Sequence, residues 1–269
     1  MTVKGAGLRH DLTALGLREG MVLLVHCSLR RVGRVDGGAA TVRDALLGTL
    51  GETGTLVVPT QSRSKSKTSK EFLASLRGLP PERHEHHFNA VPGFDPALTP
   101  SEGMGALAEA VRIHPQARRS GHPTTSFAAI GRHAAELTAE HPYQCVLGER
   151  SPLGWMHRAG AYVLLLGVGF DKCTAFHLGE DSSVSPDRSY CFKIGDSWTH
   201  VPGARDYDAS DFDELGALFS DIHGDYVRTG RVGAAPSTLF PLALAADFAD
   251  KQLPDLRGQS RRAAGSADL

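Results

Sequence analysis

Three short apolar runs, each bounded by Gly or Pro, constrain the fold of this chain more than any other feature. They are MVLLVH at residues 21–26, TLVVP at 55–59 and AYVLLLGV at 161–168. Runs of this length, rich in Val and Leu and without polar alternation, are typical of strands that are buried on both faces of a sheet. We therefore expect three core strands in a central sheet that is mixed but largely parallel.

Between these runs, apolar residues recur at helical spacing. Val42, Ala45, Leu46 and Leu50, for example, lie on one face of a helix. The helices predicted in this way span residues 37–50, 103–112, 127–137, 152–158 and 211–229. For the last of these, Ser210 is the expected N-cap. Strands that alternate with helices indicate an α/β fold.

The 269-residue chain has an ordinary globular composition, with 41% hydrophobic and 22% charged residues. We expect a single domain over residues 1–254. The polar stretches 62–70 and 80–94 are expected to be mobile surface loops. The last segment, 255–269, has little apolar content and is expected to be a flexible tail.

Several classes of function are disfavoured by charge and by apolar run length. The formal net charge is -1, so the basic surface of a nucleic-acid binder is not expected. No apolar run approaches the roughly 20 residues of a membrane span. No secretory signal is visible, so the expected compartment is the cytoplasm. The four cysteines are far apart and form no C-x-x-C pair, which argues against a disulfide framework or a zinc ribbon.

One polar cluster follows the third strand. The segment LLLGVGFDKCTAFHLGED, residues 164–181, delivers Asp171, His177, Glu180 and Asp181 just past a strand end, where α/β sheets bind ligands. If the segment is helical, His177 and Glu180 share a face. The alternative is a structural histidine, and the two interpretations are about even. The G-V-G could instead begin a dinucleotide site, but the third glycine of that fingerprint is replaced by Lys172.

A second cluster, ARRSGHPTTSF at residues 117–127, gathers Arg119, Ser120, His122, Thr124 and Ser126. Guanidinium and hydroxyl groups suit phosphate oxygens, and a helix starting near Ser126 would add backbone N–H groups. A simple turn with an N-cap is an equal alternative.

A third cluster, VHCSLRRVGRVDGG at residues 25–38, places His26 and Ser28 at the end of the first strand. Its backbone N–H groups could meet a pantetheine or a phosphate, although no P-loop sequence is present.

Two further clusters favour ordinary structural roles. The histidines at residues 84, 86 and 87 lack an H-E-x-x-H spacing, so a solvated loop is preferred over a metal site and no metal is expected. The acidic stretch from Asp206 to Glu214 is typical of helix capping, although a polycationic substrate would need such a patch.

These motifs, together with SPLG at residues 151–154, resemble the aminoglycoside 3-N-acetyltransferases in order and in spacing. The similarity runs from about Leu8 to about Leu253. Cys27, Cys173 and Gly179 depart from the residues common in that family, which are Ser, Asn and Ala. The resemblance implies a three-layer α/β/α sandwich of the antibiotic N-acetyltransferase type.

The resemblance also implies acetyl-CoA as the acetyl donor and an aminoglycoside amine as the acceptor, in a resistance enzyme that is a monomer or a homodimer. It places the catalytic histidine at His177, with Glu180 beside it. The residues expected to bind coenzyme A, including those of the two motifs, are His26, Ser28, Leu29, Arg119, Ser120, His122, Thr124, Ser126 and Phe127. The residues expected to meet the drug are Asp181, Asp206, Asp211 and Glu214.

The mechanism expected from this assignment is direct transfer within a ternary complex. His177 acts as general base on the attacking amine, Glu180 orients its imidazole, and backbone N–H groups near Ser28 or Ser126 stabilise the oxyanion. Two alternatives stay open: an acetyltransferase that acts on another amine in antibiotic biosynthesis, and a nucleotide-binding module.

Overall fold

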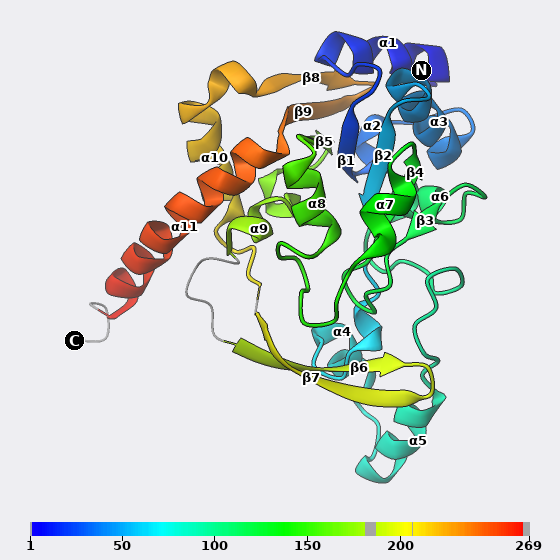
Figure 1. Cartoon of the computed structure of the whole chain (residues 1–269), viewed down its shortest axis with the longest axis vertical. Helices are drawn as coiled ribbons and strands as arrows, with labels where there is room; N and C mark the ends of the chain where they lie inside the picture. Colours follow the sequence, from blue (N-terminus) through cyan, green and yellow to red (C-terminus); the bar gives the residue numbers. More distant parts are fainter. Residues whose placement is uncertain (1, 181–186, 206, 266–269) are drawn as a thin grey trace.

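The computed structural model describes residues 2–180, 187–205 and 207–265, and within these residues a seven-stranded sheet forms the centre of the molecule (Figure 1). The strand order is β3-β4-β2-β1-β5-β9-β8. The strands are β1 (Val22–Cys27), β2 (Thr55–Pro59), β3 (Arg118–Arg119), β4 (Phe127–Gly131), β5 (Tyr162–Leu166), β8 (Arg228–Val232) and β9 (Ala235–Pro241). The three strands predicted from the sequence are β1, β2 and β5, which lie side by side at the centre.

The sheet is mixed, as predicted, but its parallel part is confined to the centre. Strand β1 pairs in parallel with β2 and with β5. The pairings β2–β4, β3–β4, β5–β9 and β8–β9 are antiparallel. The prediction of a largely parallel sheet was therefore too strong. Strands β8 and β9 form a tight hairpin with Gly233 in a left-handed conformation, and such short connections produce antiparallel neighbours.

Helices cover both faces of the sheet and complete the three predicted layers. Because side chains alternate along a strand, Leu23 and Val25 of β1 face one core, whereas Val22 and Leu24 face the other. The first core is covered by α1 (Gly5–Leu15), α3 (Gly38–Leu50) and α6 (Gly105–Arg112). The second is covered by α7 (Ala134–Ala139), α8 (Pro152–Arg158), α9 (Phe176–Glu180), α10 (Phe212–Ile222) and α11 (Leu242–Gly265).

Two helix predictions were wrong in part. Residues 127–131 form β4, and only residues 134–139 are helical. A five-residue apolar run fits both the helical and the strand period. Residues 127–131 are a strand because they pair with β2. The helix expected over 211–229 ends at Ile222, after which the 3-10 turn η4 (Gly224–Tyr226) leads into β8. Its N-cap is Asp211, one residue after the expected Ser210.

The predicted boundary of the flexible tail does not coincide with the end of a structural element. Helix α11 continues past residue 254 to Gly265, with Pro254 inside it. Arg257, within the expected tail, is held by ion pairs to Glu180 and Asp211. The composition of the tail is polar, but these ion pairs attach its first turn to the domain.

A small lobe lies beyond the carboxyl ends of the parallel strands (Figure 1). It contains η1 (Arg63–Lys65), α4 (Lys70–Ser75), η2 (Pro81–Arg83), α5 (His84–Ala90) and the hairpin of β6 (Asp187–Ile194) and β7 (Ser197–Arg205). The ring of Phe72 packs 5.6 Å from Phe88 and 5.2 Å from Trp198, and the Lys67 ammonium lies over both Phe88 and Trp198. The stretches expected to be loops thus form short helices around an aromatic cluster.

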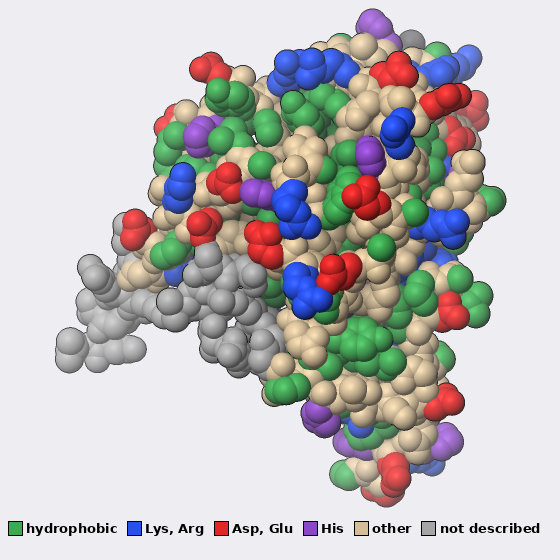
Figure 2. All heavy atoms as spheres, in the orientation of Figure 1, with side chains coloured by type: hydrophobic (Ala, Val, Ile, Leu, Met, Phe, Trp, Pro, Cys, Tyr) green, Lys and Arg blue, Asp and Glu red, His purple; other side chains and the backbone are tan. Residues whose placement is uncertain are grey.

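Acidic and basic side chains are interspersed over the face of the molecule shown in Figure 2. Within the described residues, no helix has both the length and the apolar character needed to cross a membrane.

Candidate active site

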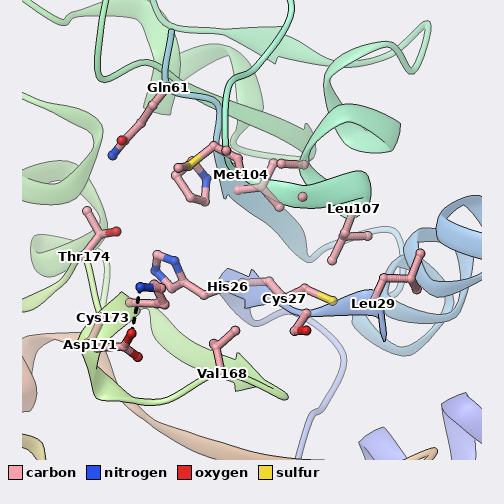
Figure 3. Close-up of a pocket in the computed structure, with 18 of the residues that line it drawn as sticks. His26, Cys27, Leu29, Gln61, Met104, Leu107, Val168, Asp171, Cys173 and Thr174 are labelled. Carbon is pink, nitrogen blue, oxygen red and sulfur yellow. Dashed lines mark ion pairs between the residues drawn. The ribbon is translucent and has the colours of Figure 1, made fainter. Parts of the chain in front are cut away.

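A cavity of about 700 Å³ opens at the carboxyl ends of the three parallel strands (Figure 3). Residues at or beyond the end of each strand line the cavity: His26 to Leu29 at the end of β1, Gln61 and Arg63 after β2, and residues between Val168 and His177 after β5. Helix α6 closes one wall with Met104 and Leu107. The cavity therefore lies where an α/β sheet is expected to bind its ligand.

His26 enters this cavity from the end of β1. Its side chain is buried, and its Nε2 atom has no hydrogen-bond partner in the described part of the chain. Burial, assisted by the neighbouring His177, lowers the pKa of His26 to about 3. The imidazole is therefore neutral at physiological pH, and it presents an unpaired polar atom at the wall of the cavity. A buried polar atom without a partner is costly, and a bound ligand would relieve that cost.

The segment after His26 turns into the short helix α2 (Leu29–Val32) with Ser28 at its N-cap. The backbone N–H of Ser28 donates to the carbonyl of Leu166 at 2.9 Å, so it is not free for a substrate. Gly167 makes this close approach feasible, because a Cβ atom there would lie 2.9 Å from the Cβ of Arg31. Ser28 and Leu29, which the resemblance places at coenzyme A, both line the cavity.

His177 lies on α9, which begins soon after β5. The preceding Phe176 is fully buried and packs against Phe170, Phe212 and Phe219. This aromatic cluster fixes α9 against α10. The imidazole of His177 stays partly exposed, with its ring 4.7 Å from that of Phe212.

Glu180 lies one helical turn after His177, and its Oε2 atom bonds to Nδ1 of His177. The Glu180 side chain is only 1% exposed. Its Oε1 atom accepts hydrogen bonds from the guanidinium of Arg257 at 2.6 Å and from the backbone N–H of Asp208 at 3.1 Å. If Nδ1 of His177 donates to Glu180, its Nε2 carries the lone pair and can accept a proton.

A second cavity of about 250 Å³ meets the first at His177. The two share Gln61, Arg63 and His177. The second is otherwise lined by residues of the small lobe, Tyr190 among them, and by Thr124, Thr125, Val146, Leu147 and Tyr207. A reactive group bound in either cavity can thus reach the same imidazole.

Most of the RSGHPTTSF motif lies away from both cavities. Of the six predicted contacts in this motif, Thr124 alone lines a cavity, the smaller of the two. Ser120, His122, Ser126 and Phe127 are fully buried, and Arg119 is enclosed by the carbonyls of Thr99 and Thr60 and the hydroxyl of Ser126. Ser126 precedes a strand, so the expected helix N-terminus is absent there. The geometry gives these five residues a structural position and does not support direct contact with coenzyme A.

The buried part of this motif is a closed hydrogen-bond network. Nδ1 of His122 accepts from the backbone N–H groups of Thr124 and Thr125, each at 3.2 Å, and Nε2 faces the carbonyl of Tyr143. The hydroxyl of Ser120 bonds to Nδ1 of His141 at 3.0 Å. Burial lowers the pKa of His122 well below its usual value and that of His141 to about 4. Both histidines are therefore neutral, and their hydrogen bonds connect the loop that contains residues 120–126 to the loop that contains residues 141–146.

The four predicted substrate carboxylates are not brought together by the described structure. Asp181 and Asp206 lie outside the described residues. Asp211 is paired with Nε of Arg257 at 2.8 Å. Glu214 is exposed on α10 and lines neither cavity.

The thiols at the cavity wall are poor nucleophiles. Burial raises the pKa of Cys27 and of Cys173 to about 12, so both remain protonated thiols. Elsewhere, His84 and His87 of α5 bond to the Leu79 carbonyl and the Ser75 hydroxyl. Among the residues the structure describes, no group of three His, Cys, Asp or Glu side chains is placed to hold a metal ion.

Sequence reasoning missed three residues of the site: Gln61, Arg63 and Arg257. Gln61 and Arg63 follow the end of β2, and the strand-end rule that selected residues after β1 and β5 applies to them equally. Arg257 carries no comparable signal, because its role depends on how α11 packs against α9.

The fold and the site together define an α/β enzyme in which a histidine–carboxylate pair, at the junction of two cavities, can take a proton from a bound substrate. The family model of aminoglycoside 3-N-acetyltransferases matches residues 24–254. The chain is 37% identical to the aminoglycoside N(3')-acetyltransferase-like protein YokD of Bacillus subtilis, over 91% of this chain and 90% of that protein. It is 35% identical to aminoglycoside N(3)-acetyltransferase IX of Micromonospora chalcea, over 90% of each. The chain belongs to the aminoglycoside 3-N-acetyltransferase family and is an acyltransferase.

Solved structures agree with this assignment. The crystal structure of YokD superposes with a TM-score of 0.88 at 35% identity, covering 95% of this chain and 94% of that one. The binary complex of AAC-IIIb with CoASH gives 0.79 at 30% identity, with coverages of 95% and 97%. AAC-VIa bound to sisomicin gives 0.77 at 28% identity, with coverages of 94% and 97%.

Proposed function

We propose that this protein transfers the acetyl group of acetyl-CoA to the 3-amine of the deoxystreptamine ring of an aminoglycoside, in a ternary complex, with His177 as general base. The observation that carries this proposal is the place of His177 at the junction of the two cavities, with its Nδ1 bonded to a buried carboxylate. The ligands of the structural relatives AAC-IIIb and AAC-VIa support the two substrate classes.

In the proposed reaction, the acceptor nitrogen attacks the thioester carbonyl of acetyl-CoA. The C–N bond forms, the tetrahedral intermediate collapses, and the C–S bond breaks to release the thiolate. The proton lost by nitrogen passes to Nε2 of His177 and then to the departing sulfur, which gives CoASH. A general base of this kind contributes about 10²–10⁴-fold to the rate.

The stabiliser of the oxyanion differs from the one expected from the sequence. The N–H of Ser28 is occupied by Leu166, and Ser126 lines neither cavity. We propose that the neutral imidazole of His26 donates to the carbonyl oxygen of the thioester, since its Nε2 atom is unpaired at the cavity wall. Its neutral state suits a hydrogen-bond donor that must not compete with His177 for the proton.

The larger cavity is assigned to the pantetheine arm and the acetyl group, and the smaller one to the acceptor. The larger cavity is lined by Ser28, Leu29 and the apolar wall of α6, which suits an extended, mostly uncharged arm. The smaller cavity is lined by the polar side chains of the small lobe.

Incubation with acetyl-CoA and sisomicin tests the proposal. We expect release of free thiol that depends on sisomicin, and NMR of the product should locate the acetyl group on the 3-amine. Thiol release with other amines and none with any deoxystreptamine drug would contradict the proposal and favour the biosynthetic alternative. The nucleotide-binding alternative has no support from the GVG segment, which leads into the 3-10 turn η3 (Phe170–Lys172) and not into a long helix.

A further inference from the structure

We infer that Arg257 of α11 is a positioning residue for catalysis: it holds Glu180, and through Glu180 the imidazole of His177, in the orientation that lets His177 accept a proton. This inference rests on the proposed function, because it assigns Arg257 to the same general base. It gives the C-terminal helix, which lies outside the two cavities, a direct influence on the reaction.

The guanidinium of Arg257 joins three segments of the site. Its Nη2 atom donates to Oε1 of Glu180 at 2.6 Å and to the carbonyl of Asp208 at 2.7 Å, and its Nε atom donates to Asp211 at 2.8 Å. The Arg257 side chain is 18% exposed. A planar fork with several donors can hold two carboxylates in fixed directions, whereas a lysine ammonium cannot reproduce that geometry.

Glu180 needs such a partner, because its side chain is only 1% exposed. Removing a carboxylate from water costs free energy unless the carboxylate is paired and hydrogen-bonded. One of its oxygens faces His177, and the other faces Arg257 and the N–H of Asp208. With both oxygens held, the carboxylate cannot rotate away from the imidazole, and Nδ1 of His177 keeps its bond.

Close packing of two helices brings Arg257 within reach. At Gly179 on α9, a Cβ atom would lie 2.4 Å from the backbone nitrogen of Asp250 and 2.7 Å from the carbonyl of Ala246 on α11. The two backbones are therefore in contact. Leu253 is fully buried on the same side of α11, one helical turn before Arg257. Glycine at position 179 therefore permits this close approach of α9 and α11.

The test compares Arg257→Gln, Arg257→Lys and the control Lys251→Gln, which removes a charge from an exposed site on the same helix. With acetyl-CoA and sisomicin, we expect Arg257→Gln to lower kcat about 10–100-fold, the equivalent of one charge-assisted hydrogen bond. KM for acetyl-CoA should stay unchanged. Arg257→Lys keeps the positive charge but not the planar fork, so it should also lower kcat. Lys251→Gln should match the parent protein.

A second readout does not depend on turnover. An imidazole proton shared with a carboxylate gives a far-downfield NMR resonance. We expect this resonance in the parent protein and in Lys251→Gln, and we expect it to weaken or vanish in Arg257→Gln and Arg257→Lys. If Arg257→Gln loses activity only in proportion to its folded fraction, with the resonance unchanged, the inference is overturned. Failure of the proposed function gives a different result. If His177→Ala keeps full activity, His177 is not the general base. The NMR resonance still shows, independently of activity, whether Arg257 positions the His177–Glu180 pair.

Discussion

His177 and His122 both lie in polar motifs of the sequence, but their surroundings in the folded chain are opposite. His177 is partly exposed where two cavities meet, and it is bonded to a carboxylate. His122 is fully buried, and its ring nitrogens face backbone groups and neutral hydroxyls. The first arrangement can take up a proton and return it. The second cannot carry a proton without burying an unpaired charge. The partner of a histidine and its access to a cavity, more than its motif, therefore decide whether it is a candidate for proton transfer.

The largest expected effect is the loss of turnover in His177→Ala at unchanged stability. We expect His177→Ala to lower kcat by about 10²–10⁴-fold, with little change in KM for acetyl-CoA or in Tm. Steady-state kinetics and a thermal scan measure both. Turnover near that of the parent protein would remove His177 from its proposed role.

The reverse pattern is expected at His122. Replacing it by Leu leaves the N–H groups of Thr124 and Thr125 without their acceptor, which costs about 2–4 kcal/mol of the free energy of unfolding. Denaturant titration should show that loss, while kcat per folded molecule changes little. The control is His10→Leu, at an exposed site on α1. A fall in kcat at unchanged stability would show that His122 acts on substrate.

Acid should destabilise the protein through its buried histidines. The pKa values of His26 and His141 are about 3 and 4 when folded, against a usual 6.5, so the unfolded chain binds more protons below pH 6.5. Their contribution to stability is complete above pH 6.5 and is lost as pH falls toward 4. Over that pH range, each of the two histidines should lower the free energy of unfolding by about 1.4 kcal/mol for each pH unit. Denaturant titrations between pH 7 and pH 4 measure the slope, and a flat profile would contradict the neutral buried state.

The smallest effect is expected at His157, which has a carboxylate partner but lies outside the large cavity. Its Nε2 atom bonds to Asp247 at 2.7 Å, and the two side chains are 27% and 60% exposed. His157→Ala should cost less than about 1 kcal/mol of stability and leave kcat unchanged. A loss of kcat comparable to that of His177→Ala would mean that a histidine–carboxylate pair is sufficient for catalysis without the cavity.

The parts of the fold that could be predicted were those with one dominant local signal. The central strands are apolar runs of a length that fits a strand buried on both faces, and the helix at residues 37–50 has a clear stripe. Residues 127–131 carry no such signal, because pairing with β2, more than 60 residues earlier, decides their conformation. The antiparallel edges of the sheet depend on the same kind of distant pairing.

For the site, sequence reasoning located His177 and Glu180 because both lie on one turn of one helix. It could not assign Asp211, since the carboxylate is paired by an arginine that is 46 residues away in the chain. It also could not separate the buried serines of the RSGHPTTSF motif from ligand contacts, because hydroxyl groups suit phosphate and backbone carbonyls equally. Burial, which only the folded chain shows, makes that distinction.

The small lobe has an aromatic cluster of its own around Phe72, Phe88 and Trp198, separate from the two cores that flank the sheet. Phe72 belongs to α4, which also supplies Lys70 and Glu71 to the wall of the smaller cavity. In evolutionary terms, the lobe can accumulate substitutions while the central sheet keeps its own packing, and an engineer can diversify the lobe on the same grounds.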